Sequence, residues 1–503
     1  MFKSEHVRIT LLLTVLLMIT VHIPASVQAR STTEALEFFL QEQRQAQRIP
    51  GLAFALVQDG EVLFTGAYGV DGYGNPLTTE TPFMLGSLSK SFTALAVMTL
   101  VEDQQLELDA PVQQYLPEFT RADQAAATIT VRHLLNQVSG LSDSSAPAAA
   151  TADPTDLQQA VASLHTATTA TAVGTEFAYF NHNYVLLGRL IEVVSGQAYA
   201  DYLRDAVLTP LALRNTTVSA TSADWPQTAP NLPPGHVTLF VFPLALPEPL
   251  PYGAPAGGII STPQDMARYL AFYTDPTPSL VTPETITLMV TRRADLDSMY
   301  AMGWYEVDPQ AVPRVIEHSG DVSTYHADMV FLPETKTAFV LLYNRNHLFS
   351  TLTGFPELRQ GVLSILAGNN ARPGVLNTTN VGSVLGIIVV LSVLKDLSGI
   401  LSARRWAQNQ RRKPRACLLA LSLDLVVPLL LLLLLPTLIG WLTGRVVTFA
   451  TAFYLAPDLV GWLIITAILA VGRSLVRMVA LVPVIRITGN HLRYNEGYET
   501  TEC

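Results

Sequence analysis

Cysteine and charge are both scarce in this chain of 503 residues. The two cysteines are Cys417 and Cys503, so the residues before Cys417 hold no disulfide and depend on a hydrophobic core for stability. Charged residues make up 14% of the chain, the formal net charge is -10, and no basic arm or basic-aromatic pattern occurs. This composition argues against a nucleic-acid partner. No acidic or cysteine partner stands at metal-ligand spacing from His133, so we expect no metal there.

The first residues have the pattern of a secretory signal. Lys3 and Arg8 precede an apolar run from Ile9 to Val21, and short side chains follow up to Ala29. This pattern predicts a signal peptide over residues 1–29, cleaved after about Ala29. The alternative is an uncleaved anchor, although the run is shorter than the ~20 residues that span a bilayer. Either way, the following domain is exported.

Long apolar stretches return only near the end of the chain. Residues 381–400, 417–442 and 459–471 predict about three transmembrane helices within a membrane domain over 373–503. The arginine and lysine residues that lie outside these stretches are unevenly distributed. The first link contains Arg404, Arg405, Arg411, Arg412, Lys413 and Arg415, the second link only Arg445, and the tail Arg473, Arg477, Arg486 and Arg493. The positive-inside rule then places the first link and the C-terminus in the cytoplasm, and residues 30–372 outside the cell.

The first candidate for chemistry is the pair Ser87 and Lys90. Residues three apart share one face of a helix, and a serine nucleophile needs a base within hydrogen-bond reach. An amine in a partly dry site has a lowered pKa and can be that base. Apolar residues at helical spacing up to Val101 predict a helix that begins near Ser87 and buries one side. The alternative is a capping serine followed by a surface lysine.

Two further patches lie far along the chain. Tyr179 and Asn181 are two residues apart, so in an extended segment both point the same way, just before a predicted helix that Gly196 ends. A phenol relays protons where neighbouring cations lower its pKa. His318, Ser319 and Gly320 end a predicted strand, where a glycine permits close approach of a substrate and a neighbouring amide points at an oxyanion. Alone, the tyrosine would be read as a core residue and the histidine as structural.

The order Ser-x-x-Lys, Tyr-x-Asn, His-x-Gly resembles the penicillin-recognising serine hydrolases, a group of class C β-lactamases, DD-peptidases and related esterases and aminopeptidases. Two supporting stretches, Thr130–Leu141 and Pro255–Met266, also resemble this family, and the likeness extends over about residues 33–365. It implies an α+β fold in which an antiparallel β-sheet is flanked by helices, with an all-α insert. It implies no metal and no cofactor.

The resemblance also implies roles for individual residues. Ser87 would be the acylated nucleophile, Lys90 its activating partner and Tyr179 the proton relay. The substrate would contact Asn181, His318, Ser319 and Gly320. The oxyanion hole would consist of the backbone amides of Ser87 and Asp321.

The third motif departs from the family pattern. His318 stands where penicillin-targeted members carry a lysine for a substrate carboxylate, and imidazole, with an ordinary pKa of about 6.5, binds anions weakly near neutral pH. This favours an esterase, amidase or peptidase over an efficient β-lactamase. Asp321–Tyr325 also replaces a glycine-rich stretch, so we expect a narrower or differently shaped site.

The remaining pattern indicates the fold. We expect a helix over about Thr33–Gln47, a hairpin over Leu52–Thr65 and further strands after Trp304. Strands near both ends with helices between them indicate one sheet flanked by helices. The stretches Ala122–Thr175 and Pro230–Pro255 are expected as rim loops that control substrate selectivity.

Together these features predict a multi-pass protein of the cell membrane with an extracellular serine hydrolase domain. It would act through a Ser87 acyl-enzyme on an ester, an amide or a D-amino-acid peptide. Two alternatives stay open. The first is an idle domain that binds a ligand in the same cleft and signals through the membrane helices. The second is transport by the membrane segment, which the scarcity of charge within the spans disfavours.

Overall fold

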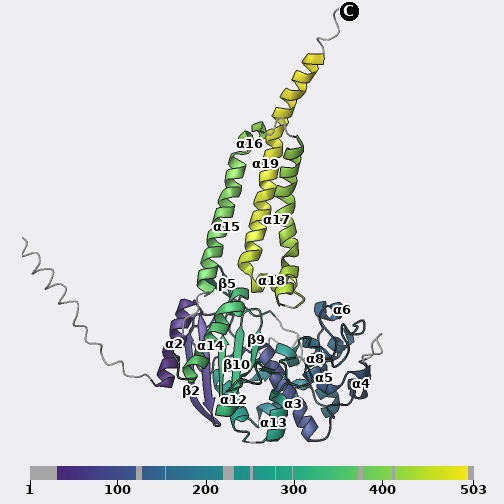
Figure 1. Cartoon of the computed structure of the whole chain (residues 1–503), viewed down its shortest axis with the longest axis vertical. Helices are drawn as coiled ribbons and strands as arrows, with labels where there is room; N and C mark the ends of the chain where they lie inside the picture. Colours follow the sequence, from purple (N-terminus) through teal and green to yellow (C-terminus); the bar gives the residue numbers. More distant parts are fainter. Residues whose placement is uncertain are drawn as a thin grey trace, which may run out of the picture.

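The computed structural model describes residues 31–119, 127–152, 154–218, 231–249, 253–277, 279–296, 298–371, 378–409, 414–443 and 445–496. The expected signal peptide, residues 1–29, lies outside these described residues. The chain forms a sheet-and-helix domain from which a group of long helices rises (Figure 1).

The centre of the domain is a six-stranded antiparallel sheet with the order β2-β1-β11-β10-β9-β8. Its strands are β1 (Gly51–Gln58), β2 (Glu61–Gly69), β8 (Tyr305–Glu306), β9 (Ile316–Asp321), β10 (His326–Leu332) and β11 (Thr337–Tyr343). Strands from both ends of the domain pair at its centre, where Leu52 of β1 lies opposite Tyr343 of β11. Successive side chains of a strand point to opposite faces. Phe54 and Ala55 accordingly pack into different core clusters, so the sheet is buried on both sides.

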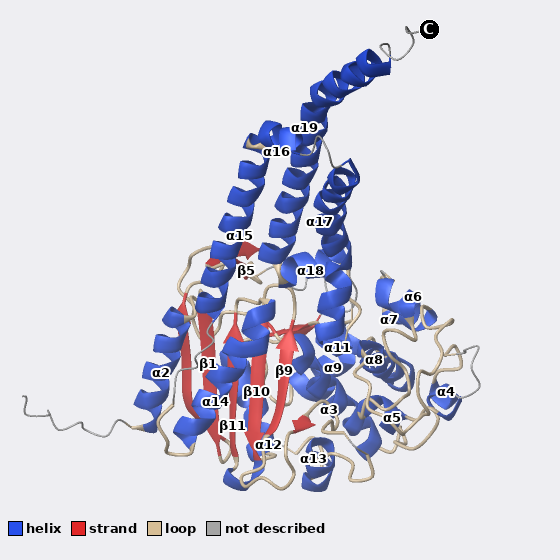
Figure 2. Cartoon of the chain, turned by 45° about the horizontal axis from the view of Figure 1, so that its top comes forward, coloured by secondary structure: helices blue, strands red, loops and turns tan. Residues whose placement is uncertain are grey.

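Helices cover the two faces of the sheet (Figure 2). On one face lie α2 (Thr32–Ala46) and α14 (Phe355–Leu366), and on the other lies α12 (Pro263–Thr274). The remaining helices of the domain are α3 (Ser89–Glu102), α4 (Val112–Tyr115), α5 (Val131–Leu135), α6 (Pro147–Thr151), α7 (Leu157–Ala162), α8 (Asn181–Ser195), α9 (Tyr199–Leu203), α11 (Ala254–Gly257) and α13 (Pro283–Val290). Smaller strands are β3 (Phe83–Met84), β4 (Thr217–Val218), β5 (Gly235–Leu239), β6 (Phe242–Leu246) and β7 (Ile259–Ser261). The predicted α+β architecture is confirmed.

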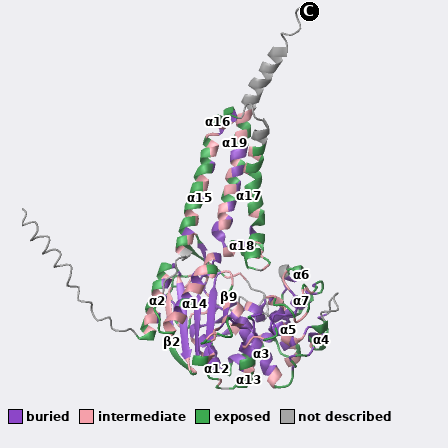
Figure 3. Ribbon diagram, in the orientation of Figure 1, coloured by how far each residue is buried: buried purple, intermediate pink, exposed green. Residues whose placement is uncertain are grey.

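The helix after Ser87 differs from its prediction in two respects. Ser87 lies in a short 3-10 turn, η1 (Gly86–Leu88), and α3 begins only at Ser89. Moreover, α3 is buried on every side from Ser89 to Leu100, although its apolar spacing indicates one buried face. The reason is its place in the core, in contact with α8 and α11 (Figure 3).

Three long helices follow the domain: α15 (Thr378–Leu401), α17 (Pro414–Thr443) and α19 (Pro457–Glu496). Each contains a segment long and apolar enough to cross a membrane, namely Thr379–Leu401, Leu419–Thr443 and Pro457–Leu481. Much of their surface is exposed, in contrast to the buried interior of the domain (Figure 3). Exposed leucines on this scale are typical of helices that face lipid. The shorter α16 (Ala403–Asn409) and α18 (Phe449–Leu455) lie between them.

The third of these helices continues past residue 471, where the sequence pattern places its end. Arg473 and Arg477, which the charge pattern assigns to the cytoplasmic tail, lie inside the apolar segment. Arg473 binds Asp396 of α15 and Asp424 of α17, and Arg477 also binds Asp424. Ion pairs between the helices neutralise these charges, which explains why they do not end the span. The spans are therefore less free of charge than the sequence pattern indicates.

The domain and the membrane helices meet in a buried contact. His347 Nε2 and Asp458 Oδ1, at the start of α19, are 3.4 Å apart, and both side chains are fully buried. Leu348 packs beside them in an apolar cluster with residues of α17, α18 and α19, including Ile439 and Val460. This contact fixes the link between α17 and α19 against the domain.

Candidate active site

Ser87 is presented by a sharp turn between β3 and α3. Gly86 has a φ of +54°, and a Cβ there would lie 2.9 Å from the backbone nitrogen of Asp321. Only glycine fits both the left-handed conformation and the close approach of β9. The turn thus places Ser87 against the end of β9, ahead of the helix that holds Lys90.

The Lys90 amine lies in the core, with Ser87 Oγ at 3.0 Å. Its other oxygen neighbours are Asn181 Oδ1 at 2.9 Å and the Ala256 carbonyl at 2.7 Å. All three oxygens are neutral. Burial, followed by the positive charge of Arg445, lowers the pKa of Lys90 well below its usual value. A neutral amine that donates to the amide and carbonyl oxygens keeps its lone pair for the Ser87 hydroxyl.

Tyr179 approaches Ser87 from the other side. Its hydroxyl donates a hydrogen bond of 2.8 Å to Ser87 Oγ. Burial is the main influence on this phenol and raises its pKa to about 12. The neighbouring cations therefore do not produce the lowered pKa that the sequence pattern predicts for this residue. The phenol is protonated at neutral pH and can donate a proton, whereas the neutral Lys90 amine can accept one.

The supporting stretch around Gln137 holds this segment in place. Gln137 Oε1 accepts hydrogen bonds from the Phe180 amide at 3.1 Å and from Asn183 Nδ2 at 2.6 Å. His133 caps α5 within the same stretch, through reciprocal hydrogen bonds with Thr130. His133 thus stabilises the start of α5.

The third motif lies along β9, where it faces the nucleophile. A Cβ on Gly320 would lie 3.0 Å from the backbone nitrogen of Ser87, so strand and turn are in direct backbone contact. The amides of Ser87 and Asp321 meet at this junction, where the sequence pattern predicts the oxyanion hole. His318 Nδ1 donates to the Ser319 carbonyl at 2.7 Å, and its Nε2 lies 3.3 Å from the Tyr300 hydroxyl. Burial lowers the pKa of His318 to about 3, so the ring is neutral.

Ser319 is directed to the opposite face of β9. Its hydroxyl donates to Asp328 Oδ1 at 2.8 Å and accepts from Arg359 Nη1 at 3.0 Å. Asp328 also neighbours His326, whose Nδ1 lies 2.7 Å from Asp321 Oδ1. Burial favours the neutral imidazole, but the two carboxylates outweigh it and raise the pKa of His326 to about 9. This charged network supports the end of β9 and the Asp321 amide.

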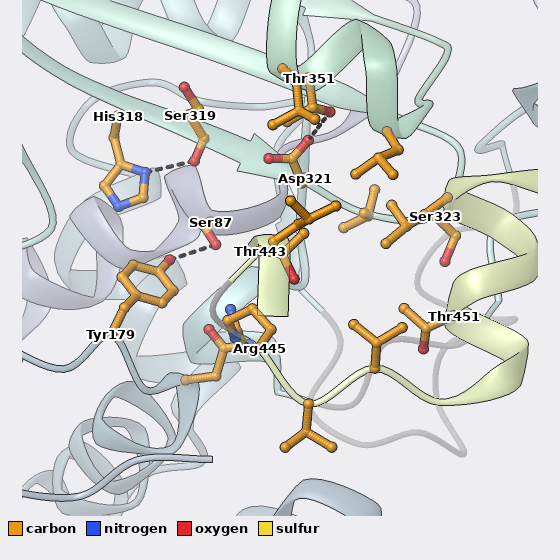
Figure 4. A pocket seen from close by; sticks show the side chains of 18 of the residues that line it. Ser87, Tyr179, His318, Ser319, Asp321, Ser323, Thr351, Thr443, Arg445 and Thr451 are labelled. Carbon is orange, nitrogen blue, oxygen red and sulfur yellow. Dashed lines mark hydrogen bonds between the residues drawn. The ribbon is translucent and has the colours of Figure 1, made fainter. Parts of the chain in front are cut away.

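A cavity of about 930 Å³ lies in front of Ser87 (Figure 4). One side is formed by Ser87, Tyr179, Asn181 and β9, which we call the floor. The other side comes from the link between α17 and α19, and we call residues 442–443 and 445–455 the roof. Among the described residues, neither Ala122–Thr175 nor Pro230–Pro255 lines the cavity. Instead, Glu248 accepts hydrogen bonds from the amides of the loop after β9, and Asp143 binds the roof.

The structure therefore brings together all eight residues expected at the site, although the Ser319 hydroxyl bonds Asp328 and Arg359 and does not face Ser87. Sequence reasoning missed the Ala256 carbonyl, the support from Gln137 and the roof residue Arg445. Of these, only Arg445 could have been noticed in the sequence, because it is the single strongly basic residue between the second and third apolar stretches. Among the described residues no cluster of metal-binding side chains occurs.

Comparison with known proteins agrees with this arrangement. A family model described as Beta-lactamase matches residues 36–360, and the chain belongs to this family. The Flp protein of Staphylococcus aureus strain MW2 is 26% identical over 320 residues, which cover 62% of this chain and 63% of that protein. Penicillin-binding protein 4 of Amycolatopsis lactamdurans is 32% identical over 237 residues, covering 46% of this chain and 61% of the relative. The chain thus spans less than two thirds of either protein.

Among solved structures, the octameric penicillin-binding protein homologue from Pyrococcus abyssi is similar to this chain. The two superpose with a TM-score of 0.56 and are 28% identical, over 67% of this chain and 78% of the homologue. The chain is a penicillin-recognising serine hydrolase relative with three apolar C-terminal helices that could cross a membrane.

Proposed function

We propose that this protein is an exported, membrane-anchored serine hydrolase that cleaves an ester, an amide or a D-amino-acid peptide through a Ser87 acyl-enzyme. One observation carries the proposal. The amine of Lys90 lies 3.0 Å from Ser87 Oγ, is buried and touches only neutral oxygens among its described hydrogen-bond partners. A buried amine without a carboxylate partner is neutral and basic, which is what a serine nucleophile requires.

The reaction then proceeds in two balanced steps. Lys90 takes the Ser87 hydroxyl proton as Oγ attacks the substrate carbonyl, and the amides of Ser87 and Asp321 stabilise the resulting oxyanion. Tyr179 gives a proton to the leaving group as the carbonyl–leaving-group bond breaks, and the Lys90 ammonium returns a proton to the phenolate, which leaves the amine neutral. Water then attacks the ester on Ser87 while Lys90 takes a proton from it. The Lys90 ammonium passes that proton to Ser87 Oγ as the acid leaves.

The proposed orientation rests on the distribution of basic residues. The stretch between the first two apolar segments, which end at Leu401 and begin again at Leu419, contains six arginine or lysine residues, and Arg486 and Arg493 remain beyond the third segment. Even without Arg473 and Arg477, this distribution supports a cytoplasmic position for the first link and the C-terminus. The catalytic domain then lies outside the cell, in agreement with the expected signal peptide.

The test is acylation of the full-length chain in neutral detergent micelles. With a p-nitrophenyl ester we expect a burst of p-nitrophenol and an acyl mass on Ser87, and Ser87→Ala lowers the rate by about 10⁴-fold or more. Ser323→Ala is the matched control, because this serine lines the same cavity without a lysine beside it. No acyl adduct, together with equal rates for Ser87→Ala, would overturn the proposal and favour an idle binding domain.

A further inference from the structure

Arg445 is fixed at the edge of the cavity by the domain itself. Its Nε lies 3.1 Å from Asp143 Oδ2, and the same carboxylate oxygen accepts a 3.1 Å hydrogen bond from the Val446 amide. The Arg445 amide donates to the Gly440 carbonyl at the end of α17. These bonds hold the guanidinium 5.4 Å from the centre of the Tyr179 ring, beside the nucleophile (Figure 4).

Part of this guanidinium is available to a ligand. Only Nε contacts Asp143, and the two terminal nitrogens have no hydrogen-bond partner among the described residues. About a third of the side chain is exposed, and it lines the cavity. A guanidinium with free terminal N–H groups binds a carboxylate or phosphate through paired hydrogen bonds.

Arg445 also has no competitor as the cationic group of this cavity. His318 is neutral because it is buried, and the Lys90 amine is occupied by three oxygens. The acidic groups of the cavity are already neutralised, since Glu317 pairs with Arg359 and Asp321 with His326. Among the described lining residues, Arg445 is thus the cation that, although paired with Asp143 through Nε, keeps terminal N–H groups for a ligand.

The surroundings of Arg445 are apolar and lie at the level where two spans end. The segment in α17 ends at Thr443 and the segment in α19 begins at Pro457. Between and beneath them the cavity is lined by Leu348, Leu352, Leu442, Val446, Val447 and Leu455. A ligand here meets one cation and a broad apolar surface, which is the complement of an anionic amphiphile.

We propose that Arg445 is a substrate-binding residue, which holds the carboxylate or phosphate of an acyl substrate whose apolar part lies against the roof. This inference rests on the proposed function and narrows it to anionic amphiphilic substrates at the membrane surface. The membrane segment is then part of the active site as well as an anchor.

The test measures binding separately from turnover. Full-length Ser87→Ala protein in neutral detergent micelles is titrated by calorimetry with adipic acid monoanilide and with hexanoic acid anilide, which have the same chain length. We expect tighter binding of the anionic anilide. Arg445→Gln should lower the ratio of the two affinities by about ten-fold or more, as expected for a charge-assisted hydrogen bond. Arg445→Lys should recover part of that ratio.

Ser323→Ala is the matched control, because this residue lines the same cavity without a charge, and it should leave the ratio unchanged. Asp143→Asn loosens the hold on Arg445 but keeps its charge, so it should lower the ratio by less than Arg445→Gln. Equal affinities for the two anilides, or a ratio that Arg445→Gln leaves unchanged, would overturn the inference. Because the titration needs no turnover, it remains decisive if Ser87 is never acylated. Conversely, acylation of Ser87 without any preference for the anionic anilide would leave the hydrolase proposal intact and refute the role of Arg445.

Discussion

The floor and the roof of the cavity are built in different ways. The floor consists of short hydrogen bonds among half-buried groups, and Tyr179, together with the buried Lys90 beneath the floor, contacts Ser87 Oγ. The roof is apolar and exposed, and a single ion pair to Asp143 joins its only cation to the domain. Dry, hydrogen-bonded surroundings are what a base and a nucleophile need, whereas an apolar surface accommodates varied ligands. Reaction and selectivity are thus expected to reside on separate segments of the chain.

Loss of the Lys90 amine should have the largest effect on acylation of Ser87. We expect Lys90→Met to lower the rate of Ser87 acylation by about 10⁴-fold, because groups that act as a unit each cost nearly the whole rate. Lys90→Arg should be equally inactive, since a guanidinium stays protonated and cannot take the serine proton. Stopped-flow measurement of the p-nitrophenol burst checks both variants. An active Lys90→Arg protein would show that charge, and not basicity, is what Ser87 requires.

Removal of the phenol hydroxyl should have the next largest effect. Tyr179→Phe keeps the ring beside Arg445 but loses the 2.8 Å hydrogen bond to Ser87 Oγ. We expect kcat to fall by about 10²- to 10³-fold, as for loss of a general acid, with little change in KM. Steady-state kinetics with esters of different leaving groups provide the check. The loss should shrink for a good leaving group such as p-nitrophenol, and an equal loss for all esters would contradict a role in leaving-group protonation.

The network of His326, Asp321 and Asp328 should make the stability of the folded chain depend on pH. The pKa of His326 is raised to about 9 in the folded chain, above its ordinary value of about 6.5. Its contribution is therefore fully present below about pH 6.5 and is lost as pH rises through about 9, an effect of about 3 kcal/mol. Thermal unfolding of the full-length chain in detergent at pH 6 and pH 9.5 measures it. His326→Gln should flatten this dependence, and an unchanged slope would count against the His326–Asp321 pair.

Arg445 connects the two sides of the cavity through its charge. Acylation requires neutral Lys90, so the rate should rise with pH as the amine loses its proton, well below the ordinary lysine range. Arg445 is the second cause of that lowered pKa, after burial. Without the positive charge of Arg445, the pKa of Lys90 should rise. Arg445→Gln should therefore move the acid limb of the pH profile of kcat/KM to higher pH, whereas Arg445→Lys should not. A neutral ester is the substrate for this measurement, and an unmoved limb would show that roof and floor are electrostatically independent.

The smallest effect is expected from the apolar roof. Val446 is exposed and lines the cavity, so Val446→Ser removes apolar surface without opening the core. We expect KM for p-nitrophenyl decanoate to rise by about two- to five-fold, in line with the loss of about one buried methyl group. KM for p-nitrophenyl acetate, which is too short to reach the roof, serves as the reference. Equal changes for the two esters would show that Val446 does not contact the acyl chain.

The sequence predicted the floor far better than the roof, for a physical reason. Ser87 and Lys90 are neighbours within one turn, and Asn181 and Gly320 lie at the start of a helix and in a strand, where local patterns determine geometry. Ser319 lines the cavity, but the alternation of β9 directs its hydroxyl to Asp328 and Arg359, on the opposite face from His318 and Gly320. The sequence likewise predicted an antiparallel sheet flanked by helices, but it did not predict the order of the six strands.

The position of the roof depends on how the C-terminal helices pack against the sheet-and-helix domain. The contact of His347 with Asp458 and the packing of Leu348 against α17 and α19 have no local signature in the chain. The same is true of Arg473, whose partners Asp396 and Asp424 lie on other helices. Periodicity finds individual helices, but it does not tell which charges will be paired between them.

The ion pair that fixes the roof joins residues 302 positions apart in the chain, Asp143 and Arg445. All of the floor is encoded before residue 372, and all of the roof after it. In a chimaera of two relatives joined near that point, Ser87 would come from one parent and the roof from the other. Exchange of the C-terminal segment would then be expected to change substrate selectivity. A protein truncated there would keep Ser87 but lose the roof residues that are proposed to bind the substrate.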